Sequence, residues 1–145
     1  MRIMAIDYGD ARTGVAVSDP TGSLAGQTFL IKSRQADIVL SELVRLAKEQ
    51  QAEELVMGYP RNMDGTLGPR AELYAAFADR LREASGLPVV LWDERRTTVD
   101  AHRILGDHGV RAKKRKDKVD SVAAALILEG YLEFKRIQAG MKPNL

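Results

Sequence analysis

Residues 2–32, "RIMAIDYGDARTGVAVSDPTGSLAGQTFLIK", decide the fold that we expect for this chain. Three apolar segments, at 2–7, 14–18 and 26–32, are separated by short stretches rich in glycine and aspartate. This spacing is typical of strands joined by tight connections. Strands that follow one another so closely must pair antiparallel, so the sequence predicts a three-stranded antiparallel meander.

After residue 32 the apolar pattern changes to a helical period. One helix is predicted to begin near Ser33, and another begins at Pro69 and ends at Gly86. The remaining predicted elements are strands at 53–58 and 87–93, a short helix from Thr97 or Thr98 to about Leu105, and a last helix over about 118–137.

These elements predict an α/β fold in a single domain over residues 1–145. Strands that alternate with helices pair in parallel through right-handed crossovers, so the two later strands should extend the meander into a mixed sheet. We therefore expect a three-layer α/β/α sandwich on a mixed five-stranded sheet, with the first strand central. In open sheets of this kind, sites gather at the carboxyl ends of the parallel strands.

The amino-acid composition limits the kinds of metal site and cross-link that the chain could form. The chain has no cysteine and only two histidines, which excludes disulfides and the usual zinc sites. Any metal would be held by carboxylates, which favours Mg²⁺ or Mn²⁺. No apolar run approaches the roughly 20 residues of a membrane span, and no apolar signal region precedes the first strand. We expect a cytoplasmic protein that does not enter a membrane.

Three separate elements are predicted to place carboxylates at the sheet edge formed by the carboxyl ends of the parallel strands. Asp7 ends the first strand, Asp93 and Glu94 follow the fifth, and Asp117 and Asp120 lie near the start of the last helix. Each has an ordinary explanation, as a turn residue, a surface ion pair or a helix-start acid. Together they would repel one another, and a divalent cation is the usual remedy.

The segment "RAKKRKDK", residues 111–118, carries six basic side chains in eight positions, although the net charge of the chain is only +2. A cluster of this kind is a candidate phosphate-binding surface. A solvated loop without a partner explains it equally well.

Four motifs, in order over nearly the whole chain, resemble those of the YqgF/RuvX family: "AIDYGDARTGVAVSD" (5–19), "MGYPRNMDGT" (57–66), "WDERRTT" (92–98) and "KVDSVAAALIL" (118–128). Members of this family have an RNase H-like fold and are described as Holliday junction resolvases and pre-16S rRNA nucleases. The three acidic positions of the family fall on Asp7, Glu94 and Asp120, whereas Asp117 matches nothing in its pattern.

The resemblance implies a metal-dependent nuclease in which Asp7, Glu94 and Asp120 hold Mg²⁺ or Mn²⁺ and the ions promote hydrolysis of a phosphodiester. The substrate implied first is the 5′ end of pre-16S rRNA, and the alternative is branched DNA. The chain is expected to act as a monomer or a homodimer. The residues expected to bind nucleic acid are Arg12, Arg95, Lys113, Lys114, Arg115, Lys116 and Lys118.

Three further interpretations stay open. An ATP-binding protein of the actin and sugar-kinase type shares the opening hairpin, but such proteins need a second domain to close over the nucleotide. A non-catalytic nucleic-acid-binding module would be marked by a lost acid, and all three are present. Tyr59 and Asn62 could contact a base or sugar, and Tyr59 could equally be a packing residue.

Overall fold

The structure, a computed structural model, describes residues 1–22, 25–59, 69–93 and 112–140, with the backbone alone for residues 112–121. Statements below refer to these residues.

The strands form one mixed sheet in the order β3-β2-β1-β4-β5. Strand β1 pairs antiparallel with β2 and parallel with β4, and β5 continues the parallel side. The predicted meander and the central position of the first strand are therefore confirmed. The strands are β1 (Ile3–Asp7), β2 (Arg12–Ser18), β3 (Ala25–Lys32), β4 (Glu54–Tyr59) and β5 (Val89–Asp93).

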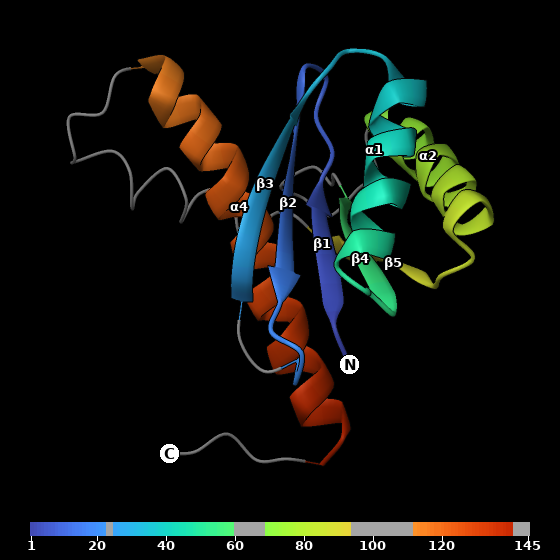
Figure 1. Cartoon of the computed structure of the whole chain (residues 1–145), viewed down its shortest axis with the longest axis vertical. Coiled ribbons are helices and arrows are strands. Elements are labelled where there is room, and N and C mark those ends of the chain that lie inside the picture. The colour runs from blue at the N-terminus through green and yellow to red at the C-terminus, as the bar shows by residue number, and fades with distance from the viewer. Residues whose placement is uncertain (23–24, 60–68, 94–111, 141–145) are drawn as a thin grey trace.

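Helices cover both faces of the sheet. Helices α1 (Ala36–Glu49) and α2 (Pro69–Ser85) lie on one face, and α4 (Ala112–Gln138) crosses the other, as Figure 1 shows. The predicted three-layer α/β/α sandwich is confirmed. Pro69 opens α2 and Gly86, with φ +70°, follows its end, as the sequence predicted for both residues.

Alternation along β1 divides the core between the two faces. Met4 and Ile6 are buried with the apolar sides of α1 and α2, whereas Ile3 and Ala5 are buried against α4. Because successive strand residues point to opposite faces, Asp7 belongs to the same face as Ile3 and Ala5. The carboxylate predicted to ligate metal is thus on the α4 side of the sheet.

Two predicted helix starts are wrong. Helix α1 begins after Gln35, and the Ser33 hydroxyl instead accepts the Gln35 N–H at 3.1 Å, which forms a turn just before the helix. Helix α4 begins at Ala112 and not near residue 118. Lysine and arginine are good helix formers, so the basic segment extends the helix instead of forming a loop.

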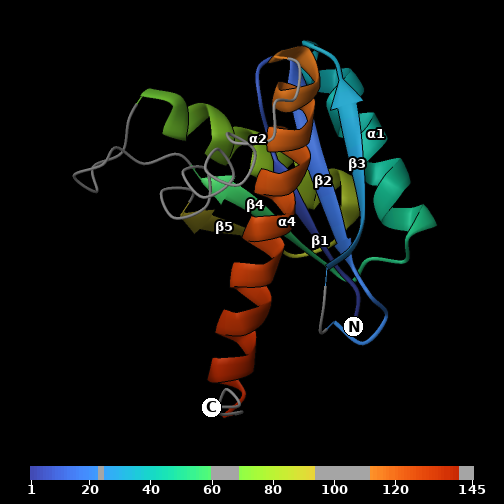
Figure 2. The same cartoon turned by 90° about the vertical axis from the view of Figure 1, so that its left-hand side faces the viewer.

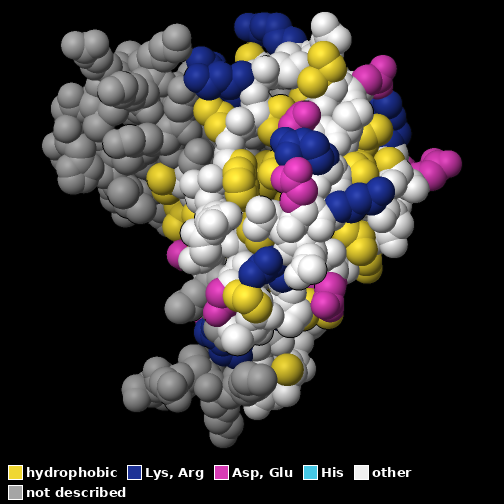
Figure 3. Space-filling view, viewed as in Figure 1, with side chains coloured by type: hydrophobic (Ala, Val, Ile, Leu, Met, Phe, Trp, Pro, Cys, Tyr) yellow, Lys and Arg dark blue, Asp and Glu magenta, His cyan; other side chains and the backbone are white. Residues whose placement is uncertain are grey.

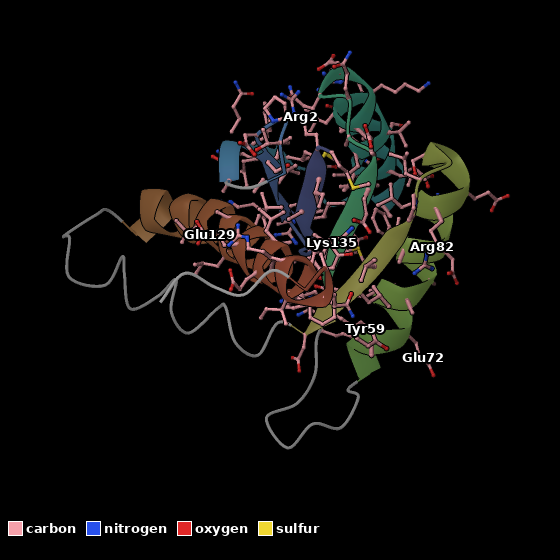
Figure 4. The ribbon with its side chains drawn as sticks, turned by 90° about the horizontal axis from the view of Figure 1, so that it is seen from below. Arg2, Tyr59, Glu72, Arg82, Glu129 and Lys135 are labelled. Atoms are coloured by element: carbon pink, nitrogen blue, oxygen red, sulfur yellow. The ribbon has the colours of Figure 1, made fainter. Side chains whose placement is uncertain are left out.

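Polar side chains join the layers at the amino ends of the parallel strands. Tyr131 donates a 2.9 Å hydrogen bond to Glu54 at the start of β4, and Lys135 forms an ion pair with the same carboxylate. Figure 4 shows Lys135 reaching from α4 toward the sheet. These contacts anchor the second half of α4 to the end of the sheet opposite Asp7.

Candidate active site

Asp7 is the last residue of β1 and is only partly buried, while the four residues before it are buried. Its register partner on β2 is Gly14. Residues paired across neighbouring strands lie side by side on one face, so glycine leaves no side chain next to the carboxylate. Asp7 therefore stands at the carboxyl end of the central strand, and its neighbour on β2 has no side chain.

Helix α4 runs along this face toward the amino end of β1. Ile3 and Leu132 line a common cavity of about 270 Å³, so the amino end of β1 and the second half of α4 lie near each other. Figure 2 shows the last turns of α4 near the N-terminus of the chain and its first turns at the other end of the sheet. Twelve residues back from Leu132 along a helix is about 18 Å, and β1 from Ile3 to Asp7 spans about 13 Å.

The backbone of position 120 therefore lies close to the level of Asp7, within about one helical turn. Ala124, Ile127 and Tyr131 are buried against the sheet. Position 120 precedes them at the spacing i, i+4, i+7 and i+11, which is one face of a helix. The side chain of Asp120 itself is outside the described residues.

The connection from Asp7 to Arg12 is tight. An added Cβ at Gly9 would lie 2.3 Å from the carbonyl oxygen of Arg12, so the two backbones approach too closely for any other residue at this position. Arg12 opens β2 and pairs with Lys32 on β3. Both cationic residues are therefore at the edge of the sheet where β1 ends, and Arg12 is close in sequence to Asp7.

Tyr8 follows Asp7 and packs on the opposite face. Its ring stacks on Phe77 with centroids 4.0 Å apart and meets Tyr74 edge-on at 5.2 Å. Burial raises the pKa of the Tyr8 phenol, and Asp10 adds to that rise while Arg80 opposes it. Both aromatic partners of Tyr8 lie on α2. This helix therefore packs against the residue that directly follows Asp7, the predicted metal ligand.

A polar chain runs beside these rings. The Tyr74 hydroxyl donates to the main-chain carbonyl of Tyr8, and Arg70 donates to the Tyr74 hydroxyl at 2.9 Å and to Asp10 at 3.2 Å. This network was not predicted from the sequence. The spacing of Arg70 and Tyr74 by one helical turn was visible, but their contact with residues 8 and 10 depends on how α2 packs.

Two of the candidate acids, Asp7 and Asp93, lie on opposite faces of the sheet. Trp92 packs against the α4 side of the sheet, so strand alternation assigns Asp93 to the α1–α2 side, away from Asp7. Tyr59 pairs with Asp93 and packs against the core under α1 and α2. Tyr59 is thus a packing residue, which is one of the two interpretations left open by the sequence.

Several predicted site residues lie outside the described residues: Glu94, Arg95, Asn62 and the short helix predicted at 97–105. Within the parts of the chain that are described, no group of three or more Asp, Glu, His or Cys side chains could hold a metal ion. Of the three proposed ligands Asp7, Glu94 and Asp120, Asp7 is the one whose side chain lies within the described residues. Its partly exposed carboxylate at a strand end is a donor that suits Mg²⁺ or Mn²⁺.

Lys113, Lys114, Arg115, Lys116 and Lys118 all belong to the first turns of α4, whose backbone alone is described there. On the face drawn in Figure 3, basic and acidic side chains are interspersed over the described surface and form no field of one sign. Several of the basic groups are in ion pairs, including Arg45 with Glu42 and Glu49.

In the described part of the chain, no helix combines the length and apolar character that crossing a bilayer requires.

Comparison with known proteins gives a consistent result. Residues 1–134 match the model of the RuvX family, which is described as Holliday junction resolvase. A protein of Halothermothrix orenii named "Putative pre-16S rRNA nuclease" is 47% identical over 138 residues, covering 93% of this chain and 96% of that protein. A protein of the same name from Geobacillus kaustophilus is 46% identical over 138 residues, covering 94% of this chain and 100% of the relative.

Among solved structures, Thermus thermophilus RuvC in complex with a Holliday junction substrate has a TM-score of 0.57 at 13% identity, covering 100% of this chain and 99% of that one. The Fowlpox virus resolvase, also solved with Holliday junction DNA, has a TM-score of 0.53 at 9% identity, covering 98% and 100%. At such low identity these structures show a shared RNase H-like fold. The match to the family model and the relatives at 46–47% identity show that this chain belongs to the RuvX family.

Proposed function

We propose that this protein is a metal-dependent endonuclease that hydrolyses phosphodiester bonds in structured nucleic acid, with pre-16S rRNA as its substrate. The observation that carries the proposal is the position of Asp7 at the carboxyl end of the central strand, on the sheet face that α4 covers. The names of the relatives, which cover nearly the whole chain, support the choice of rRNA.

The proposed ligands are Asp7, Glu94 and Asp120. The third member of this set is supported by the helical repeat of α4, in which position 120 continues the spacing of the buried residues Ala124, Ile127 and Tyr131. Glu94 is proposed from the family motif, because it follows directly after β5. Divalent cations bound by such carboxylates would activate water and neutralise the charge that develops on the phosphate.

The remaining proposed residues hold the substrate. Arg12, which opens β2 after the turn that follows Asp7, would contact a phosphate near the cleaved bond. Arg95, which follows Glu94 in the sequence, would either bind phosphate or orient Glu94. The basic first turns of α4 would follow the sugar–phosphate backbone, because a helix presents cations at regular spacing along its length. Contacts of this kind give affinity with little sequence preference.

Branched DNA is the second candidate substrate. It is favoured by the description of the matching family as Holliday junction resolvase. Backbone contacts do not discriminate well between folded RNA and branched DNA, so both must be offered to the protein. The absence of cysteine supports a cytoplasmic location, and the protein would act as a monomer or a homodimer.

The experiment compares wild type, Asp7→Asn and Asp19→Asn on an rRNA precursor and on four-way junction DNA, with Mg²⁺ or Mn²⁺. Asp19 is a matched control because it follows β2 at the opposite end of the sheet, where it accepts the Thr21 hydroxyl. We expect Asp7→Asn to lower kcat by at least about 100-fold and Asp19→Asn to leave it unchanged. Equal cleavage by all three proteins would exclude the proposed site, and cleavage of the junction alone would select the DNA substrate.

A further inference from the structure

The carbonyl group directly after Asp7 is held by a side chain from α2. Tyr74 is only 4% exposed, and its hydroxyl donates a hydrogen bond to the main-chain oxygen of Tyr8, 66 residues away. Arg70, one helical turn earlier, donates to the same hydroxyl and to Asp10. Arg70 and Asp10 are largely exposed, so the buried member of this network is Tyr74.

The chemistry of the three groups sets the direction of each hydrogen bond. A guanidinium can only donate and a carbonyl can only accept. The Tyr74 hydroxyl must therefore accept from Arg70 and use its single hydrogen for the Tyr8 carbonyl. The guanidinium also lies 5.4 Å from the centre of the Tyr74 ring, which adds a cation–π contact. Arg70 thus supports the arrangement, while Tyr74 makes the contact with the strand end.

The contacts that hold Tyr8 all come from one side of the sheet. Tyr8 is held by its carbonyl and by stacking on Phe77, both on the α2 side. Asp7 belongs to the α4 side by strand alternation. The Tyr8 carbonyl belongs to the peptide between Tyr8 and Gly9, so its hydrogen bond and the stacked ring together restrain Tyr8, the residue bonded to Asp7. These contacts leave unoccupied the face on which the Asp7 carboxylate would bind metal.

We propose that Tyr74 is a positioning residue for Asp7: through the Tyr8 carbonyl it sets the direction of the Asp7 backbone, and hence the aim of its carboxylate. The inference rests on the proposed role of Asp7 in metal binding. Removal of a group that orients a metal ligand without touching the metal commonly lowers metal affinity or activity by about 10- to 100-fold.

The chain offers a matched control for Tyr74→Phe. Tyr131 is also 4% exposed, and its hydroxyl donates to Glu54 at the amino end of β4, away from Asp7. Tyr131→Phe removes an equivalent buried hydroxyl and keeps the ring. Any general loss of stability should therefore be shared by the two variants, and only an effect on the site should differ between them.

The experiment makes three kinds of measurement on wild type, Tyr74→Phe and Tyr131→Phe. They are the ¹³C shift of the Tyr8 carbonyl, the Mn²⁺ concentration that half-broadens the amide signal of Gly14, and kcat and KM for cleavage. For Tyr74→Phe we expect a shifted Tyr8 carbonyl signal, a Mn²⁺ midpoint raised about 10-fold and kcat lowered about 10-fold. KM should stay within about twofold of wild type, because the phosphate-binding groups are untouched. Tyr131→Phe should match wild type in all three.

An unchanged Mn²⁺ midpoint in Tyr74→Phe, or one equal to that of Tyr131→Phe, would overturn the positioning role. A third variant, Arg70→Leu, keeps the Tyr74 hydroxyl and should change the Mn²⁺ midpoint less than Tyr74→Phe does. An equal or larger change would mean that the charge of Arg70, and not the Tyr74 hydroxyl, governs Mn²⁺ binding, and this would also overturn the proposal. If wild type binds Mn²⁺ near Asp7 but cleaves neither nucleic acid, the nuclease proposal fails while the Mn²⁺ midpoints still test the positioning of Asp7.

Discussion

Asp7 on β1 is paired with Gly14 on β2, and both residues belong to the sheet face that α4 covers. A partly exposed carboxylate beside a glycine has room for a ligand, whereas a larger neighbour would fill that space. Because of its pairing with Gly14, Asp7 is the residue whose substitution should have the largest effect on metal binding.

Divalent metal should stabilise the folded protein through Asp7. A ligand that binds only the folded state raises the free energy of unfolding by about 2.7 kcal/mol at 100 times its Kd. We expect Mn²⁺ to raise the Tm of wild type and of Asp19→Asn, and to leave the Tm of Asp7→Asn nearly unchanged. Thermal unfolding with and without EDTA measures this, and an equal Mn²⁺-dependent rise in all three proteins would contradict it.

Replacing Gly9 by alanine should destabilise the turn after Asp7. The new Cβ would lie 2.3 Å from the main-chain oxygen of Arg12, and neither backbone can move without disturbing the paired strands. Strain of this kind lowers the free energy of unfolding by about 1–3 kcal/mol. Urea denaturation should show the loss, with kcat falling as well because Asp7 is two residues away.

Replacing Gly130 by alanine should instead raise the free energy of unfolding. Gly130 lies inside α4, and an added Cβ would make an ordinary contact with the Trp92 ring at 3.4 Å. Alanine is more favourable than glycine in a helix interior by about 0.5–1 kcal/mol. Gly130→Ala should therefore raise the urea midpoint, and a lower midpoint would mean that Trp92 cannot accommodate the methyl group.

The basic first turns of α4 should govern the salt dependence of binding. Replacing Lys113, Lys114 and Lys116 by alanine should reduce the slope of log K against log[salt] by about 2–3, because each lost phosphate contact removes about 0.7–0.9. The control removes the same charge at the opposite end of the sheet, from Arg45, Lys48 and Arg136. Fluorescence anisotropy over a salt series measures both slopes; equal slopes for the two triple variants would exclude a special role for the basic segment.

Stability should fall at alkaline pH in a way that depends on Tyr131. Burial, and then the hydrogen bond to Glu54, raise the pKa of this phenol above its ordinary value of 10.0. Below about pH 10 the phenol is protonated in both states and its contribution is constant. Above that, the unfolded chain releases the proton first, so the free energy of unfolding decreases as pH rises, by at most about 1.4 kcal/mol per pH unit. Tyr131→Phe should fall less steeply in urea denaturation between pH 9.5 and 11.

The amino-acid sequence by itself determined the elements and their order in the sheet. Apolar periods of two and of 3.6, tight connections near Gly9 and Gly22, and the Pro69 and Gly86 boundaries act over a few residues, so they can be read locally. The strand-end rule gave Asp7, Asp93, Glu94, Asp117 and Asp120 as candidate acids. The family resemblance selected Asp7, Glu94 and Asp120 among them, and the roles of these residues stay predictions. The position of Asp7 at the end of the central strand followed from the same local patterns.

Tertiary structure alone decided which side chains meet. The contact of Tyr74 with the Tyr8 carbonyl spans 66 residues and exists only because α2 packs over the end of β1. The separation of Asp93 from Asp7 onto opposite faces required the register of β5. The start of α4 at Ala112 was missed because charge suggested a loop where intrinsic helix propensity continues the helix. Local patterns specify elements, but the direction in which a side chain points at a site is set by packing between elements distant in sequence.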